Sequence, residues 1–302
     1  PSNQPCKFGG EFKVEVGKLS ACLWVNGKGT WISYPKRANN ALNYYEKTKL
    51  KAYQEIQKLY TGSPTKSIAL KYELSNSFPA DLKQSYIEQT ERASQFYDSF
   101  FTEPTIVNAY YQTEKDEKYL KSHPILSRDS ESFKTWFTEW KMGKSLQHNI
   151  GLAAWYFTFD GKTEGHTGVL VGSQATKKTL RLYSEQVVAH EYFHTIQMRP
   201  MKGVNVRESS WPPDWIREGS AQWFSTTFGF DDFDQLINYQ KMDAERDLYR
   251  SKASPEYLGA VLSLGTIRSE NGWLAYNVGS KVIEALVVLK GVDSILEFYN
   301  LG

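Results

Sequence analysis

Cysteine, histidine and long apolar runs are all scarce in this sequence. Only two cysteines occur in 302 residues, Cys6 and Cys22, and two thiols are too few for a zinc site built from cysteines. Histidine occurs five times. The longest apolar stretches, 150–159 and 282–289, have the size of core elements and are well short of the roughly 18–20 apolar residues of a membrane span. The sequence therefore predicts neither a cysteine metal centre nor a transmembrane helix.

An excess of charge of one sign is also missing. Lysine and arginine total 36, aspartate and glutamate total 34, and the net charge is +2. The two signs are interspersed, so nothing indicates a nucleic-acid-binding surface. The apolar content of 40% and the charged content of 23% are typical of a globular protein. The length suffices for one large domain or for two lobes that share a core.

The two cysteines bear on the cellular compartment. A disulfide between Cys6 and Cys22 would close a short N-terminal loop and would indicate an oxidising compartment. Two free thiols in a cytosolic protein are the alternative. Because the chain starts at Pro1 without a methionine, we expect a processed or trimmed product. We therefore expect an exported protein, periplasmic, secreted or at the cell surface, with a cytoplasmic location as the other possibility.

Turn residues at 61–64 indicate a boundary in the chain. Residues 1–66 predict a small N-terminal extension, with hairpin strands at 11–16 and 21–25 and a helix at 40–60. Residues 67–302 predict the main region, in which a sheet lobe that ends with the helix around residues 190–194 (67–199) precedes a mainly helical lobe (200–302). The expected fold class is α+β, with a mixed β-sheet.

Alternating apolar residues predict the strands of the sheet lobe, at 67–74, 105–111, 152–159 and 167–171. Asp160-Gly161 lies between the last two strands and is a typical hairpin signal. Pro79 is expected in the first turn of a helix that runs to about residue 101. Helices are further predicted at 114–122, 133–142, 214–229 and 282–289. The strand 167–171 is a candidate edge strand for pairing with an extended peptide.

The pentapeptide His-Glu-Tyr-Phe-His at 190–194 lies in a segment with helical character. On a helix, His190 and His194 lie one turn apart on one face, where two imidazoles can bind the same metal ion. Glu191 lies on the rim of that face and can reach a metal-bound water. This is the H-E-x-x-H zinc pattern. An ordinary amphipathic helix is the alternative, but buried His and Glu side chains need partners.

The flanks of the pentapeptide support a buried helix with defined ends. Residues 187–189 are Val-Val-Ala, which favours burial of the helix. Ser184 is expected to cap its N-terminus, and Pro200 is expected to end it.

A catalytic zinc site takes three protein ligands, so one more ligand is needed. His123, His148 and His166 lie in segments predicted as loops or strand ends, where surface positions are favoured. A third His placed six residues after His194 is excluded, because Pro200 occupies that position.

Glu218 is the better candidate for the third ligand. It lies 24 residues after His194, on a predicted helix of its own, and the following Gly219 lets two helices approach closely. A glutamate would complete a His2Glu site, the zinc set that suits peptide hydrolysis. A solvated carboxylate at the start of a helix is the alternative interpretation.

Three segments together resemble the gluzincin metallopeptidases, the thermolysin-like and aminopeptidase-N-like enzymes. They are the pentapeptide 190–194, Trp-Ile-Arg-Glu-Gly-Ser-Ala at 215–221 and Tyr-Asn-Val-Gly at 276–279. The resemblance covers roughly residues 67–302. It implies one zinc ion, a catalytic water and Glu191 as general base and acid. It also implies that Tyr276 stabilises the oxyanion, with a core tyrosine as the alternative.

The sequence departs from the gluzincin pattern in two places. Many members carry an acidic residue four positions after the glutamate ligand, where this chain has Gln222. A glutamine can still orient a zinc-bound His through its amide oxygen. The G-x-M-E-N segment with which aminopeptidase-N-like enzymes hold a substrate's N-terminus is absent, which argues against a standard aminopeptidase and favours an endopeptidase.

The sequence as a whole predicts a zinc-dependent peptidase whose partner is a peptide or protein substrate. A catalytically inactive binding protein with the gluzincin fold is one alternative, although the intact Glu191 argues against it. A zinc hydrolase of a non-peptide amide or ester is another, because the metal chemistry is the same.

Overall fold

The computed structural model describes thirteen stretches of the chain: residues 12–15, 18–25, 28–35, 44–61, 70–97, 106–112, 116, 150–159, 162–171, 183–197, 212–230, 232–240 and 273–300. Two compact units make up the chain. The first unit combines Pro1–Ser63 with Ile196–Gly302, and the second unit is Pro64–Thr195. Cys6, Pro200 and the helix predicted at 133–142 lie outside the described residues, and so does the helix predicted at 114–122 apart from residue 116.

The second unit contains a mixed sheet of four strands. These are β4 (Leu70–Leu74), β5 (Ile106–Gln112), β6 (Ile150–Phe159) and β7 (Lys162–Val171). Their order is β4-β5-β7-β6. Strands β4, β5 and β7 are parallel, whereas β6 is antiparallel to β7. Strands β6 and β7 are thus antiparallel neighbours separated by two residues, as the Asp160-Gly161 signal predicts.

The expectation that 167–171 forms an edge strand is wrong. These residues belong to β7, which lies between β5 and β6 in the sheet. Among the described strands, the two edges are β4 and β6. The pairing of β7 with β5 joins segments that are distant in sequence, and alternation within a strand does not indicate which neighbours it has.

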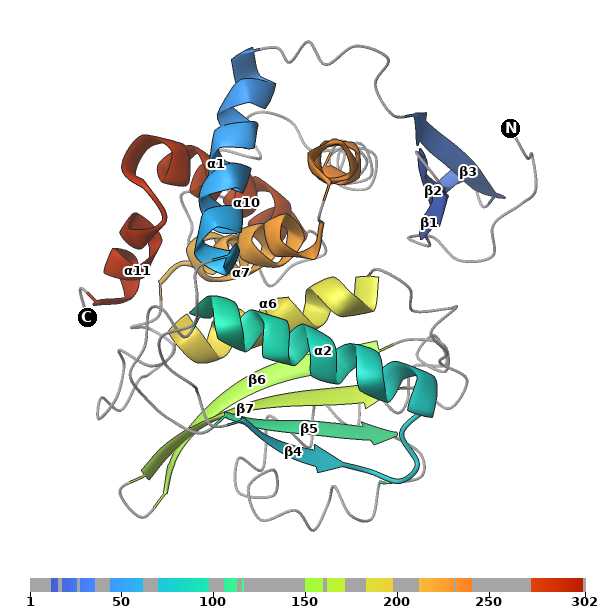
Figure 1. Ribbon diagram of the computed structural model, residues 1–302, viewed down its shortest axis with the longest axis vertical. Coiled ribbons are helices and arrows are strands. Elements are labelled where there is room, and N and C mark those ends of the chain that lie inside the picture. The colour runs from blue at the N-terminus through green and yellow to red at the C-terminus, as the bar shows by residue number, and fades with distance from the viewer. Residues whose placement is uncertain are drawn as a thin grey trace. The chain divides into compact units, whose positions relative to one another are not determined.

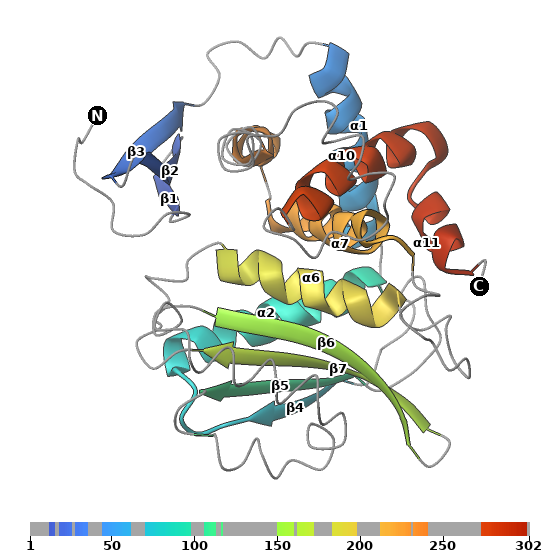
Figure 2. The same cartoon turned by 180° about the vertical axis from the view of Figure 1, so that it is seen from behind.

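Helices α2 (Ala80–Tyr97) and α6 (Tyr183–Gln197) lie over the same face of this sheet, as Figure 1 and Figure 2 show. Helix α2 begins directly after Pro79. The Pro79 carbonyl oxygen accepts hydrogen bonds from the backbone nitrogens of Leu82 and Lys83, both at 3.1 Å. Its residues Leu82, Tyr86, Thr90 and Ala93 are all buried, with the spacing of a single helical face.

Helix α6 is buried around most of its circumference. Val188, Ala189, Tyr192, Phe193 and Ile196 are at most 4% exposed, and these positions point to several sides of the helix axis, so the fold surrounds this part of the helix. The helix begins at Tyr183, so Ser184 lies in its first turn rather than before it, where a cap was expected.

The first unit is built around a set of helices and contains a small antiparallel sheet. Its helices are α1 (Tyr44–Thr61), α7 (Asp214–Gly229), α10 (Trp273–Lys290) and α11 (Asp293–Asn300), and residues 233–240 are also helical. Its sheet has the order β1 (Phe12–Glu15), β2 (Lys18–Val25), β3 (Lys28–Pro35). Helix α10 packs against α7, α1 and α11.

Two glycines form the contact between α7 and α10. A Cβ atom on Gly219 would lie 2.5 Å from the carbonyl carbon of Gly279, and a Cβ atom on Gly279 would lie 2.2 Å from the carbonyl oxygen of Trp215. Both obstacles are backbone atoms, which no rotamer change can move. Only glycine at both positions therefore permits the observed separation of the two helices at this point. The close approach agrees with the prediction made from the small residue after Glu218.

A buried polar network attaches α1 to α10. The Lys49 Nζ and Glu284 Oε1 atoms are 3.0 Å apart, and the two side chains are 5% and 6% exposed. Gln240 completes the network: its Oε1 accepts from Lys49, and its Nε2 donates to Glu284 Oε2 at 3.2 Å. A buried ion pair of this kind is costly to break because one charge is then left without its partner.

None of the helices in the described part of the chain is long and apolar enough to cross a membrane.

We predict that Gly279→Ala destabilises the first unit. The added methyl group would overlap the Trp215 carbonyl oxygen, and such overpacking costs about 1–3 kcal/mol, although alanine has the higher helix propensity. Chemical denaturation followed by circular dichroism measures the change. Ala285→Ser at an exposed position of the same helix is the control, and a Gly279→Ala protein as stable as wild type would contradict the close contact.

Candidate metal centre

Helix α6 holds His190 and His194 with their rings facing each other. The two Nε2 atoms are 3.1 Å apart, the ring centroids are separated by 4.7 Å, and the ring planes are nearly perpendicular at 83°. Both side chains are buried, with 6% and 8% of their surface exposed. The i,i+4 spacing on a continuous helix produces this arrangement, as the pentapeptide predicts.

The separation of the two nitrogens suits a shared metal ion. An ion at about 2.0–2.1 Å from each Nε2 atom, the usual Zn–N distance, would make an N–metal–N angle of about 100°, given their 3.1 Å separation. That angle is near the tetrahedral value. When one of the two Nε2 atoms carries a proton, the same separation allows a hydrogen bond between the rings, and a metal ion would take the place of that proton.

Glu191 completes a group that could hold a metal ion. One ligand atom from each of His190, Glu191 and His194 lies within 4.8 Å of the others. Glu191 is partly exposed whereas the two histidines are buried. Its carboxylate thus borders the histidine pair from a position that solvent reaches.

The residues inside the pentapeptide anchor the helix. Tyr192 and Phe193 have no exposed surface, so packing fixes the side of α6 opposite the histidines, through Tyr192, and one flank of the histidine face, through Phe193. A fixed backbone is the condition for two ligands to keep their geometry before the metal binds.

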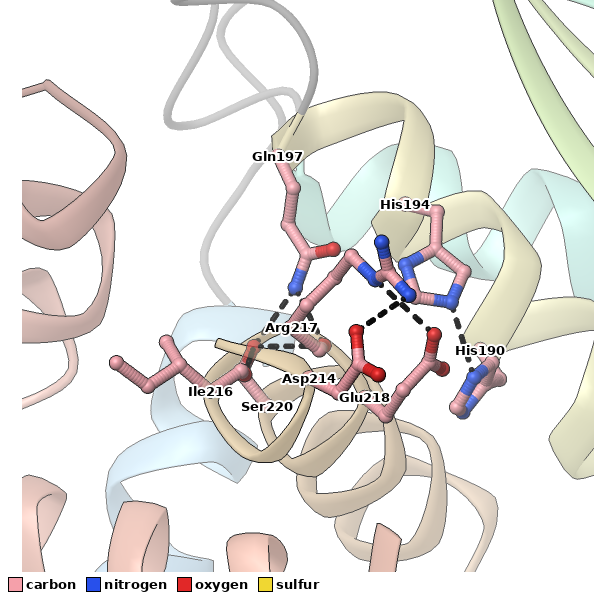
Figure 3. A network of polar contacts seen from close by, with 8 residues as sticks. All are labelled: His190, His194, Gln197, Asp214, Ile216, Arg217, Glu218 and Ser220. Atoms are coloured by element: carbon pink, nitrogen blue, oxygen red, sulfur yellow. Dashed lines mark hydrogen bonds and ion pairs between the residues drawn. The ribbon is translucent and has the colours of Figure 1, made fainter. Parts of the chain in front are cut away.

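Glu218, the predicted third ligand, lies in the second turn of α7, where it takes part in a chain of ion pairs (Figure 3). Arg217 Nη2 is 2.8 Å from Asp214 Oδ1, and Arg217 Nε donates to Glu218 Oε1 at 3.1 Å. The Glu218 side chain is 13% exposed. A carboxylate that is largely buried and hydrogen-bonded by a guanidinium has a restricted orientation.

The turn at the start of α7 explains the position of this carboxylate. The carbonyl oxygen of Pro213 accepts the amides of Ile216 and Arg217 at 2.8 and 3.1 Å, so the helix starts at Asp214, as the two prolines before it predict. The helix ends at Gly229, also as the sequence predicts.

The two other predicted site residues lie in the first unit. Gln222 is on α7, one turn after Glu218, and is partly buried. Tyr276 is on α10, one turn before Gly279, and is also partly buried. The metal-capable group of the described residues consists of His190, Glu191 and His194, so the roles of Glu218, Gln222 and Tyr276 stay predictions.

Gln197 is a buried residue at the site that the sequence did not single out. Its side chain is 3% exposed, and its Nε2 atom donates to the Arg217 carbonyl oxygen at 2.9 Å and to Ser220 Oγ at 2.7 Å, as drawn in Figure 3. Its position in the sequence could have drawn attention to it, because it is a polar residue one turn after the predicted ligand His194.

No protein-family model, no curated protein and no solved structure matches this chain. The functional interpretation therefore depends on the residues of the site and their geometry.

We predict that the wild-type chain binds one zinc ion and that His194→Ala does not. The second imidazole is needed because a single histidine offers one ligand atom only. Atomic absorption after gel filtration measures the zinc content, and added zinc should raise the Tm of wild type alone, since a ligand that binds only the folded state stabilises it. His148→Ala, which changes a histidine outside the pentapeptide, is the control. Stoichiometric zinc in His194→Ala would contradict the site.

Proposed function

We propose that the protein is a zinc-dependent peptidase with a gluzincin-like catalytic region. The observation that carries this proposal is the buried pair of imidazole Nε2 atoms 3.1 Å apart on α6, with the Glu191 carboxylate in the same group. Two imidazoles and an adjacent carboxylate are the ligands and the base that a metal-assisted hydrolase requires.

Glu218 is the third ligand in this proposal. A His2Glu set leaves one position of a four-coordinate zinc ion for water. The hydrogen bond from Arg217 to Glu218 Oε1 supports the assignment, because carboxylates that bind metals are themselves held by hydrogen bonds.

In the proposed hydrolysis, different residues of this chain carry different roles. When bound, zinc supplies a water with a pKa of about 7 and polarises the substrate carbonyl. The Glu191 carboxylate accepts the proton of the attacking water and passes it to the leaving amine. The Tyr276 hydroxyl donates a hydrogen bond to the developing oxyanion, and Gln222 orients a histidine ligand through its amide oxygen.

An extended peptide is the substrate that the sheet would accept. Strand β6 is an edge among the described strands and is antiparallel to β7. The backbone of an edge strand can pair with a peptide, so that main-chain hydrogen bonds hold the substrate whatever its sequence. This favours cleavage within a chain over the hydrolysis of a small amide or ester.

We predict that Glu191→Gln lowers kcat/KM at least about 100-fold, because glutamine cannot accept the proton, while zinc stays bound at one ion per chain. A chelator-sensitive assay with casein or a fluorogenic peptide measures the activity, and elemental analysis measures the zinc. Glu88→Gln, the same change at an exposed position of α2, should retain full activity. Full activity in Glu191→Gln would sink the proposed mechanism, and zinc loss would make Glu191 a ligand instead.

We also predict that Glu218→Ala loses zinc on dialysis against a weak chelator, because a site with two protein ligands binds the ion more weakly than one with three. Circular dichroism should show that the variant remains folded. Glu297→Ala, at an exposed position of the same unit, is the control. A Glu218→Ala protein with an unchanged zinc content would show that another residue is the third ligand.

A further inference from the structure

We propose that Gln197 is a positioning residue of the metal site, whose side-chain amide fixes the turn of α7 that carries Glu218. This inference rests on the proposed function, since it requires Glu218 to be a ligand. Its basis is the pair of hydrogen bonds from Gln197 Nε2 to the Arg217 carbonyl oxygen at 2.9 Å and to Ser220 Oγ at 2.7 Å.

The two acceptors lie on either side of Glu218 in the sequence. Arg217 precedes Glu218 directly, and Ser220 follows it by two residues. One amide nitrogen thus contacts the same helical turn at two points, which restricts both the translation and the rotation of that turn. Because metal ligands must be held within about 0.5 Å of their productive geometry, a contact of this kind bears directly on the Glu218 carboxylate.

In both hydrogen bonds with α7, the Gln197 side-chain amide must be the donor. Ser220 Oγ donates its single proton to the Ile216 carbonyl oxygen at 2.6 Å, so it can only accept from Gln197. The Arg217 carbonyl oxygen is an acceptor as well. Both amide protons of Gln197 are therefore used, and the direction of each bond is fixed by the chemistry of its partner.

The Gln197 side chain is buried, so the loss of its two hydrogen bonds is not compensated by water. Gln197 and Ser220 are 3% and 0% exposed, so water cannot readily replace a lost partner. A buried polar group without a partner costs more than the net contribution of the hydrogen bond it replaces. A variant at position 197 that cannot donate therefore loses both polar contacts with the turn of α7 that carries Glu218.

Gln197 also lies on the helix that carries the histidine pair. It follows His194 by three residues within α6, and residues at that spacing share a side of a helix. The helix links the histidine ligands to the amide that contacts α7.

Two substitutions separate the hydrogen bonds from the volume of the side chain. Gln197→Met keeps the length of the side chain and removes both donors. Gln197→Glu keeps the shape and places a carboxylate against two oxygen acceptors, so its effect should be larger. We expect Gln197→Met to weaken zinc affinity about 10–100-fold, the usual effect of losing a residue that orients a ligand.

The decisive measurement is a double-mutant cycle on the full chain, with zinc affinity determined by competition against a chromophoric chelator. The four proteins are wild type, Gln197→Met, Glu218→Ala and the double variant. If Gln197 acts by positioning Glu218, Gln197→Met weakens zinc binding in the wild-type background and has no further effect once Glu218 is absent. Gln84→Met at an exposed position of α2 is the control and should bind zinc like wild type.

Each other outcome overturns the inference in a recognisable way. An equal loss of affinity in both backgrounds would mean that Gln197 has a purely structural role, and an unchanged affinity in Gln197→Met would mean that it has none at the site. If Glu218→Ala alone binds zinc normally, the ligand assignment in the proposed function fails, and the inference fails with it.

Ser220→Ala provides a second route if Gln197→Met does not fold. It removes one of the two acceptors and leaves the Gln197 side chain in place, so a smaller loss of zinc affinity is expected, again only when Glu218 is present. A loss that persists without Glu218 would count against the positioning role.

Discussion

The contact between Gly219 and Gly279 is the constraint on which the arrangement of the first unit depends. A Cβ atom on either residue would come within 2.6 Å of backbone atoms of the other helix, so α7 and α10 can have this separation only with glycine at both positions. Glu218 precedes one glycine, and Tyr276 lies one turn before the other. The glycines that accompany these residues in the sequence are thus explained by helix packing, without any part in catalysis.

Two of the buried polar clusters in the described part of the chain differ in how their groups are satisfied. In the cluster of Lys49, Gln240 and Glu284, donors meet acceptors, and each ionic group faces an opposite charge or an amide. Such a closed network needs no further component. In the pair of His190 and His194, two ring nitrogens of the same kind face each other, and at most one hydrogen fits between them. Either one shared hydrogen or a bound cation can join these two nitrogens, and the Glu191 carboxylate in the same group makes a cation the option that the proposed site uses.

Local signals predicted much of this structure. The pentapeptide lies in a helix, the strands before and after Asp160-Gly161 are antiparallel neighbours, and α7 runs from the residue after Pro213 to Gly229. Features that depend on distant segments were not predictable: the central place of β7, the attachment of α1 to α10 through Lys49, and the bonds of Gln197. Periodicity and turn residues report on their own neighbourhood, whereas these contacts depend on the packing of the whole unit. Export stays a prediction, because Cys6 lies outside the described residues.

Helix α7 is held at two places close to Glu218, the residue proposed as the third ligand, and in that proposal this bears on the energetics of metal binding. Gly219 meets α10 by direct backbone contact, and the carbonyl oxygen of Arg217 accepts from Gln197 at the end of α6. Arg217 further restricts the carboxylate itself. A carboxylate whose backbone and side chain are ordered in advance loses little conformational entropy when an ion binds, so more of the coordination energy contributes to affinity. A glutamate on a loop, with the same charge and distance in sequence, would lack this advantage, which is why the helix that carries Glu218 matters as much as the residue.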